Sequence, residues 1–560
     1  MKKRILWMLP AAAGAATLAA VGLADSSSGP SLTNVPTANT KSIGYAPWNR
    51  TSQEIVDVAR AQGSTPLENP IGITRFYGYQ NDVVSSDNPN TPQMVPTAGV
   101  NNEAQKTEPD KNTYLVFKNG LPGADANYDY GNSFLFQGHE LAAKENGLTQ
   151  GYVTRINLDA DAAHRVTLVA LKDNTGAPLP VIDGSTWDPW SKRLLVTQEG
   201  NGSSNGGVWQ VTADSVAPAS NADNLQSQIG RGGYEGIQND QAGNLYIVED
   251  IGGSNKTGTV AKRPNSFVYR FVPTDPANLT KGGKLQALQV LHADGTPITF
   301  DSQLPLNSPD QLLIHGGTTL DTKWVTIHTG ITPGGFDANA AAKAALATPF
   351  KRPENGVFQP GTKFDTFFFD ETGDTSSTSA ENGAAGGWGS VMKLTGLSPT
   401  SDSGKLTLFY LAAQATASPD NIQFLARDTF TYVQDMGDGL HSSGNAFDSA
   451  FAFNVDADYS KPDTKPVRWL AEGRDASATI DSASGGGFGK NDGDNEITGI
   501  HVSDGDPSTG GILGAKIPNP FHAGWRWFWN QQHGDNIAWE VLPASAGVSE
   551  SNREGEPGGN

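Results

Sequence analysis

Two stretches that lie far apart in the chain carry carboxylates at matching positions. Glu235 and Asp250 are fifteen residues apart in GYEGIQNDQAGNLYIVED (250 − 235), and Asp420 and Asp435 have the same spacing in SPDNIQFLARDTFTYVQD (435 − 420). Both stretches end in an aromatic and β-branched run of the kind that forms strands. Carboxylates gathered at one place repel one another unless cations neutralise them. Ligand sets made only of oxygen favour hard ions, calcium first.

Four further segments follow a similar pattern of polar opener, turn, aromatic-rich strand and polar closer. Residues 183–199 and 354–370 begin and end in acids, Glu140 ends NSFLFQGHE, and Glu496 opens EITGIHVSDG. Six loosely repeated units of short strands predict an all-β fold, a six-bladed β-propeller with inserted loops and short helices. We expect the innermost strand of each blade to have one carboxylate just before it and another just after it, so that the acids collect around the central axis.

The composition narrows the range of partners. The formal net charge is −20 over 560 residues, with a pI near 4.8. Nucleic acids and anionic membrane surfaces both require a basic footprint, so neither is an expected partner. The absence of cysteine excludes disulfides, thiolate metal ligands and a cysteine nucleophile.

The chain divides into four predicted regions. Residues 1–24 combine a basic MKKR start, an apolar stretch and a small-residue cleavage site, which predicts a signal peptide and export to the periplasm or the cell exterior. An uncleaved membrane anchor is the alternative. Residues 25–45 read as a flexible linker, 46–545 as the propeller domain and 546–560 as a flexible tail.

Two segments are expected to form short helices. The first is SQEIVDVARAQG at residues 52–63, and the second is the alanine-rich ANAAAKAALA at residues 338–347.

Taken in chain order, the motifs resemble the PhoX-type alkaline phosphatase family. The matching pieces extend from Gly131 to Asn536 and are GHE, TWDPWSKRLLVTQE, YEG, VED, RPE, SPDNI, EITG and QQHGDN. The resemblance implies a six-bladed propeller with a pair of iron ions and several calcium ions, held mostly by carboxylates and one cysteine. It also implies hydrolysis of phosphate monoesters outside the cytoplasm.

The resemblance also implies roles for individual residues. The metal ligands would be Glu140, Glu199, Glu235, Asp250, Glu354, Asp420 and Glu496. Arg352 would be catalytic and would contact a phosphate oxygen, because guanidinium matches phosphate geometry. The alternative interpretation is that the carboxylates occupy ordinary blade turns and that Arg352 pairs only with Glu354.

Two departures from the family pattern bear on the cofactor. Thr197 stands where the family has its cysteine, and Gln198 stands where a glutamate would follow. Loss of two anionic ligands disfavours iron more than calcium, which accepts hydroxyl and amide oxygens. In addition, the KKR start lacks the twin-arginine export signal that family members usually carry. Both departures favour a calcium-dominated or metal-poor site.

Together these observations predict an exported, metal-dependent phosphatase that acts on a phosphorylated small molecule. Two alternatives stay open: a non-catalytic, calcium-stabilised propeller that binds a partner at the cell surface, and another calcium-dependent hydrolase such as a lactonase.

Overall fold

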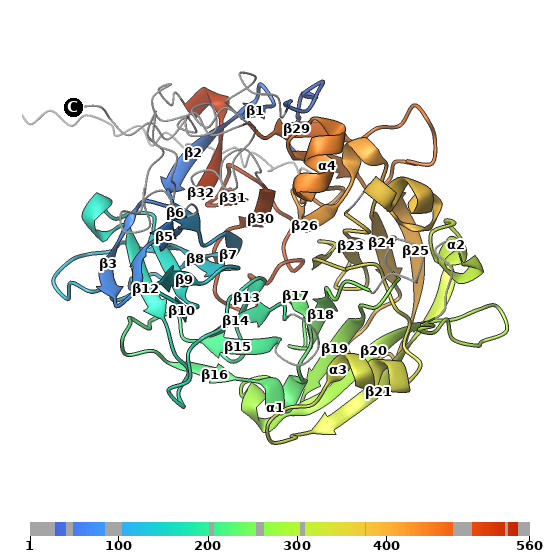
Figure 1. Cartoon of the computed structure of the whole chain (residues 1–560), viewed down its shortest axis with the longest axis horizontal. Coiled ribbons are helices and arrows are strands. Elements are labelled where there is room, and N and C mark those ends of the chain that lie inside the picture. The colour runs from blue at the N-terminus through green and yellow to red at the C-terminus, as the bar shows by residue number, and fades with distance from the viewer. Residues whose placement is uncertain are drawn as a thin grey trace, which may run out of the picture.

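The computed structural model describes residues 29–40, 49–83, 104–200, 206–253, 263–302, 308–375, 377–473, 496–532 and 536–546. In these residues the strands form six antiparallel units around one axis (Figure 1). The predicted all-β, six-bladed β-propeller is confirmed. The predicted signal peptide lies outside the described residues, and so do residues 547–560 of the predicted tail.

The first three blades each contain four strands, which follow one another from the axis outwards. Blade one consists of β7 (Pro109–Val116), β8 (Ser133–His139), β11 (Val153–Asn157) and β12 (Val166–Ala170). Blade two consists of β13 (Ser185–Asp188), β14 (Arg193–Gln198), β15 (Gly207–Val211) and β16 (Ala222–Asn224). Blade three consists of β17 (Tyr234–Asn239), β18 (Leu245–Glu249), β19 (Val268–Pro273) and β20 (Gly283–Val290).

The other three blades follow the same order. Blade four consists of β22 (Gly356–Phe358), β23 (Phe367–Glu371), β24 (Ser390–Thr395) and β25 (Ser403–Leu411). Blade five consists of β26 (Pro419–Phe424), β27 (Thr429–Gln434), β28 (Ser449–Asn454), β29 (Val467–Ala471) and β1 (Arg50–Thr51). Blade six consists of β30 (Glu496–Ser503), β31 (Arg526–Gln532), β32 (Ile537–Pro543) and β2 (Ile55–Ala61).

The last blade joins the two ends of the described chain. Strand β2 pairs antiparallel with β32, with Ile55 opposite Pro543 and Ala59 opposite Trp539. The helix expected at residues 52–63 is therefore wrong. The edge of β32 offers unpaired backbone groups, and the β-branched Ile55, Val56 and Val58 suit the strand that pairs with it.

Short two-stranded sheets and helices lie in the connections between the blade strands. Three two-stranded elements lie outside the six blades: β3 (Pro66–Ile71) with β4 (Thr74–Phe76), β5 (Tyr79–Val83) with β6 (Ala104–Lys106), and β9 (Ala143–Glu145) with β10 (Leu148–Gln150). The α-helices are α1 (Gln226–Ile229), α2 (Pro309–Ile314), α3 (Ala338–Ala344) and α4 (Gly437–Gly444). The helix expected at residues 338–347 is confirmed by α3, where the Asp337 side chain accepts a bond from the Ala340 backbone N–H.

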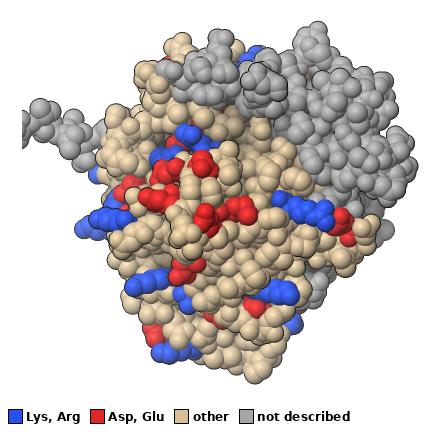
Figure 2. All heavy atoms as spheres, turned by 90° about the vertical axis from the view of Figure 1, so that its left-hand side faces the viewer, with Lys and Arg blue, Asp and Glu red and all other residues tan. Residues whose placement is uncertain are grey.

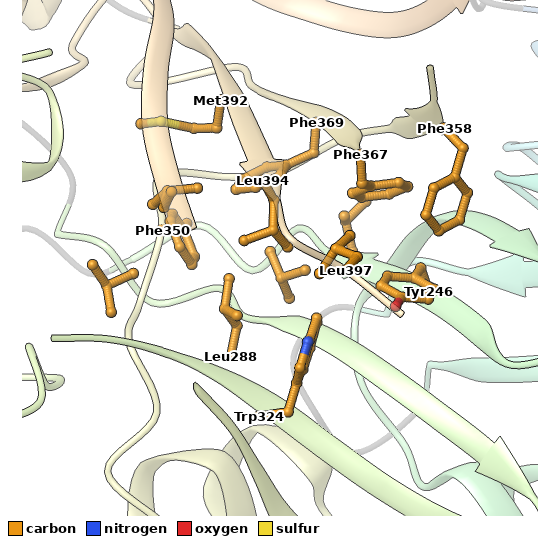
Figure 3. Close-up of a cluster of buried hydrophobic side chains, with 14 of the residues drawn as sticks. Tyr246, Leu288, Trp324, Phe350, Phe358, Phe367, Phe369, Met392, Leu394 and Leu397 are labelled. Atoms are coloured by element: carbon orange, nitrogen blue, oxygen red, sulfur yellow. The ribbon is translucent and has the colours of Figure 1, made fainter. Parts of the chain in front are cut away.

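Blades three and four are joined into one nine-stranded sheet. Strand β21 (Leu320–Gly330) pairs with β20 on one side and with β25 on the other. Figure 3 shows the hydrophobic cluster between these blades, in which Tyr246, Trp324, Phe358 and Phe367 lie close together. The Tyr246 ring meets the Trp324 and Phe358 rings edge-on, at centroid distances of 5.6 Å and 4.9 Å. Such contacts fix the angle between neighbouring blades.

The connection after β30 packs across the end of the channel at which the innermost strands finish. Gly505 accepts a bond from Val116 N of blade one, Pro507 accepts one from the Trp187 indole of blade two, and Ile512 belongs to the cluster between blades three and four. The innermost strands therefore begin at the opposite end of the channel, which we call the mouth.

Part of the predicted linker packs against blade five. Val35 and Asn39 are buried, Val35 N donates to Arg468 O, and Asn39 Nδ2 donates to the carbonyls of Ala471 and Glu472. Residues 29–40 are thus anchored on the blade.

Acidic and basic side chains are interspersed on the side of the molecule that Figure 2 presents, without a continuous basic stripe on that side. Among the described helices, none combines the length and apolar character that crossing a membrane would require.

The closure of the propeller contains a buried titratable group. Asp57 of β2 accepts a bond from the Trp529 indole at 3.3 Å, and burial raises the pKa of Asp57 to about 7. A carboxyl that keeps its proton only in the folded state loses stabilising free energy as the pH rises from the unfolded pKa, near 4, through 7. We expect Asp57→Asn, which cannot titrate, to raise the melting temperature by roughly 2–4 °C at pH 8 and by little at pH 5.

Scanning calorimetry at the two pH values tests this expectation, with the exposed Asp463→Asn as control. An equal change at both pH values would show that Asp57 does not titrate in this range.

Candidate metal centre

The repeated unit is a β-hairpin, which determines where its carboxylates lie. Tyr234 at the start of β17 pairs with Glu249 at the end of β18, and Pro419 pairs with Gln434 in the same way. The expectation that the two carboxylates flank one innermost strand is therefore wrong. The first acid opens the innermost strand and the second follows the neighbouring strand. Because the two strands are antiparallel, both acids lie at the mouth.

All six blades place a carboxylate at or next to the start of the innermost strand. These residues are Asp110, Asp183, Glu235, Glu354, Asp420 and Glu496. In four blades another acid follows the second strand, and these residues are Glu140, Glu199, Asp250 and Asp435. The equivalent position is Thr372 in blade four and falls outside the described residues, at position 533, in blade six. We call these ten carboxylates the acid ring.

The acid ring is shielded from water. Six of its members are buried and the remaining four are half-buried. Arg352 and the buried Lys111, whose ammonium donates to Ile500 O at 3.0 Å, bring positive charge to the ring. Two positive charges leave a large negative excess, and a dry environment makes that excess costly.

Two groups of three carboxylates are close enough to hold a metal ion. The ligand oxygens of Asp110, Glu140 and Asp183 all lie within 4.8 Å of one another, and the same holds for Asp183, Glu199 and Glu235. Oxygens that share one calcium ion, each about 2.3–2.6 Å from it, lie within roughly 5 Å of one another. Asp183 belongs to both groups, so it is placed to bridge two cations.

The protonation of the ring reflects burial and crowding. Burial, reinforced by Asp110, raises the pKa of Glu140 to about 7, and burial together with Asp250 raises the pKa of Glu199 to about 8. Burial also raises the pKa of Asp183, Glu235 and Glu496 well above the ordinary carboxyl range. Without cations the ring therefore retains protons at neutral pH.

Hydrogen bonds orient several ring members. Thr498 Oγ1 donates to Asp110 at 2.7 Å, Gln532 Nε2 donates to Glu140 at 2.9 Å, and Thr372 Oγ1 donates to Glu354 at 2.6 Å. By contrast, Asp250 Oδ1 and Asp420 Oδ2 are buried and have no hydrogen-bond partner among the described residues. Buried carboxylate oxygens without donors fit a site that cations complete.

Arg352 lies within the ring with its backbone in the left-handed region (φ 58°). Its Nε and one terminal nitrogen contact Asp250 Oδ2 at 2.7 Å and 2.6 Å, and it lies 3.4 Å from Glu354 Oε1. It also donates to Thr375 Oγ1 at 3.2 Å. The guanidinium is thus held at the mouth by an acid of blade three and an acid of blade four.

Thr197 is buried, and its hydroxyl already forms a hydrogen bond. Its hydroxyl donates to the backbone carbonyl of Glu235 at 2.7 Å, and it therefore supports the start of β17. Gln198 is half-buried at the end of β14, directly before Glu199.

The residues singled out in the sequence influence one another across the blades. Glu496, for example, is influenced by Asp435, Glu140 and Asp420 from other blades, and Glu354 by Asp250 and Asp420. Their role as metal ligands is a proposal, developed below.

Sequence reasoning missed the ligand potential of Asp110, Asp183 and Asp435. Asp183 and Asp435 were already visible as repeat ends. Asp110 was hidden because a long loop, residues 117–132, separates β7 from β8 and breaks the spacing seen in other hairpins.

A family model described as alkaline phosphatase PhoX matches residues 191–452, which extend from blade two into blade five. A search of the curated proteins gave no match.

Among solved structures, the chain is similar to Pseudomonas fluorescens PhoX in complex with vanadate, a transition state analogue. The two sequences are 11% identical, the match covers 92% of this chain and 98% of that chain, and the TM-score is 0.52. This similarity extends over the whole propeller. Sqt1 from Chaetomium thermophilum is 11% identical over 74% of this chain and 93% of that chain, with a TM-score of only 0.30.

Proposed function

The chain belongs to the PhoX-type alkaline phosphatase family, and on this premise we propose that it is a metal-dependent phosphatase that hydrolyses phosphate monoesters at the acid ring. The observation that carries the proposal is the pair of carboxylate trios that share Asp183. The substrate would be a phosphorylated small molecule that enters at the mouth.

The residues fit oxygen-liganded cations. Asp110, Glu140 and Asp183 would hold one ion, and Asp183, Glu199 and Glu235 a second; Asp250, Glu354, Asp420 and Glu496 are further ligand candidates in the same ring. When bound, such cations would reverse the local charge, polarise a phosphoryl oxygen and lower the pKa of an attacking water.

Calcium is the cation that we propose. Every ligand atom in the two trios is a carboxylate oxygen, which suits hard ions. The resemblance to the family also implies iron held partly by a cysteine, and this chain contains none. Thr197 does not compensate, because its hydroxyl is already bonded to the Glu235 carbonyl. The residues therefore fit calcium and not a thiolate-liganded iron site.

Arg352 is proposed to bind and orient the phosphoryl group. Its guanidinium is already at the mouth, and one of its five N–H groups is left over from the contacts with Asp250, Glu354 and Thr375. The planar guanidinium can keep two N–H groups on Asp250 while it presents a further N–H to phosphate, a fixed geometry that an ammonium lacks.

For Arg352→Lys we therefore expect a fall of roughly 10–100-fold in kcat/KM for a phosphate monoester, carried largely by KM, with the melting temperature nearly unchanged. Steady-state kinetics together with thermal unfolding check this. If Arg352 only neutralises Asp250 and Glu354, lysine would serve as well, and kcat/KM would stay near the wild-type value.

The proposed function is tested by assaying purified protein with p-nitrophenyl phosphate and with a chromogenic lactone, each with calcium and with excess chelator. Calcium-dependent hydrolysis of the phosphate ester supports it. Hydrolysis of the lactone alone would favour the lactonase alternative, and calcium binding without either activity would favour a non-catalytic propeller.

We also propose that the protein is exported, on the strength of the signal-like residues 1–24. Calcium is abundant outside cells, so an exported chain would meet its cation after transport.

A further inference from the structure

Blade five carries a second pair of buried acids, at the ends of its third and fourth strands, in addition to Asp420 and Asp435 of the acid ring. Asp448 directly precedes β28 and Glu472 directly follows β29. The two strands pair antiparallel, with Ser449 opposite Ala471, and Glu472 N donates to Asp448 O at 2.9 Å. Cross-strand neighbours at the ends of a pair bring their side chains close together.

Both side chains are fully buried, and three of their four carboxylate oxygens lack hydrogen-bond partners. Glu472 has a relative exposure of 0%, and neither of its carboxylate oxygens has a partner among the described residues. Asp448 is equally buried, and its Oδ2 is likewise without a partner there. A buried carboxylate with no donor is rare in native proteins, because its desolvation is not compensated.

The groups that surround the pair do not balance its charge. His441 of α4 places Nε2 at 3.1 Å from Asp448 Oδ1, and Met436 N donates to the same oxygen at 3.2 Å. Asp435 adds negative potential on Asp448. Next to Glu472, the Asn39 side-chain amide donates to the backbone carbonyl of Glu472 and not to its carboxylate. No described lysine or arginine forms an ion pair with either acid in the structure.

Two arrangements would reduce the cost of burying these carboxylates. Each carboxyl can hold a proton, or one cation can lie between the two side chains. Burial raises the pKa of Asp448 to about 6 and the pKa of Glu472 well above its ordinary value. Asp448 therefore loses its proton as the pH rises through about 6, whereas a cation keeps both groups ionised and supplies a partner to all three unpaired oxygens.

We propose that Asp448 and Glu472 bind a hard divalent cation, calcium being the best match, at a second site on blade five. The donor set consists of carboxylate oxygens, which is the chemistry that calcium selects. Apart from burial, the perturbation of Glu472 comes from Asp448, and no member of the acid ring contributes to it. Glu472 is thus set apart from the ring, whereas Asp448 also experiences the charge of Asp435.

The position of this site gives it a structural role. A cation held there joins the start of β28 to the end of β29, and Asn39 attaches the N-terminal segment to the same point. Calcium would thus stabilise the outer part of blade five without taking part in hydrolysis.

Metal content tests the proposal. Protein is equilibrated with calcium, freed of unbound ions and analysed by plasma mass spectrometry. We expect Glu472→Gln and Asp448→Asn each to hold about one calcium fewer per chain than wild type, while the exposed Asp463→Asn holds the wild-type number. Phosphate-ester hydrolysis at saturating calcium should be unchanged in Glu472→Gln.

The outcome is independent of the proposed function. Asp183→Asn should lose ring cations but keep the blade-five cation, which separates failure of one site from failure of the other. A wild-type calcium count in Glu472→Gln, with a melting temperature above that of wild type in chelator, would overturn the proposal and show that the pair is simply protonated. If both variants fail to fold, a crystal of the calcium-loaded wild-type protein decides: density for an ion between Asp448 and Glu472 supports the site, and an empty site overturns it.

Discussion

Asp183→Asn is expected to reduce kcat for phosphate-ester hydrolysis by at least about 100-fold. Asp183 is the one residue shared by both carboxylate trios, so its replacement removes a charged oxygen ligand from each proposed ion at once. The amide keeps the size of the side chain and can still accept a hydrogen bond. Steady-state kinetics at saturating calcium measure the loss, and metal analysis of the same sample should show fewer bound ions.

The matched control is Asp214→Asn, which changes an exposed aspartate of the same blade. It should leave both activity and metal content at wild-type values. If Asp183→Asn retains full activity and the wild-type metal content, Asp183 does not bridge two cations, and the proposal that the two trios share a ligand is wrong.

Removal of divalent cations is expected to lower the melting temperature markedly. Ions that bind only the native state stabilise it by about 3 kcal/mol at a hundred times their dissociation constant, and the ring offers at least two sites. The loss should also depend on pH. Burial raises the pKa of Glu140 to about 7 and of Glu199 to about 8 in the cation-free protein, against values near 4.5 in the unfolded chain.

Groups with raised pKa values favour the folded state at low pH, and this contribution is lost as the pH rises through 7 and 8. The melting temperature of chelated protein should therefore fall between pH 5 and pH 8, whereas that of calcium-loaded protein should stay nearly level, because bound ions keep the carboxylates ionised in both conditions. Differential scanning calorimetry in matched buffers measures both curves. Superimposable curves with and without chelator would remove the case for a cation-filled ring.

The fold could be read from the sequence because the repeat is a local property of each blade. The hairpin 235–250 and its counterpart 420–435 share spacing, turn and strand composition, and these features suffice to indicate a propeller. The wrong helix at residues 52–63 has the opposite cause. Its strand conformation depends on pairing with β32, nearly five hundred residues later, and no local signal reports such a partner.

Part of the candidate site could also be predicted from the sequence, because some of its residues belong to the local repeat and others do not. Glu235 and Asp420 stand out because their hairpins are short and alike, whereas Asp110 is separated from Glu140 by an inserted loop. Distances between blades, such as those that make Asp183 common to two trios, follow from the closed ring as a whole. The pair Asp448 and Glu472 is likewise formed by strand pairing and has no repeat that would reveal it.

The central claim is that cations in the acid ring make this chain a phosphatase. The most direct test is to titrate calcium into cation-free protein and to record bound calcium and p-nitrophenyl phosphate hydrolysis in the same samples. The account predicts that hydrolysis rises from background as the ring fills and that Asp183→Asn stays near background throughout. Full occupancy of the ring by calcium with no hydrolysis above background would contradict it.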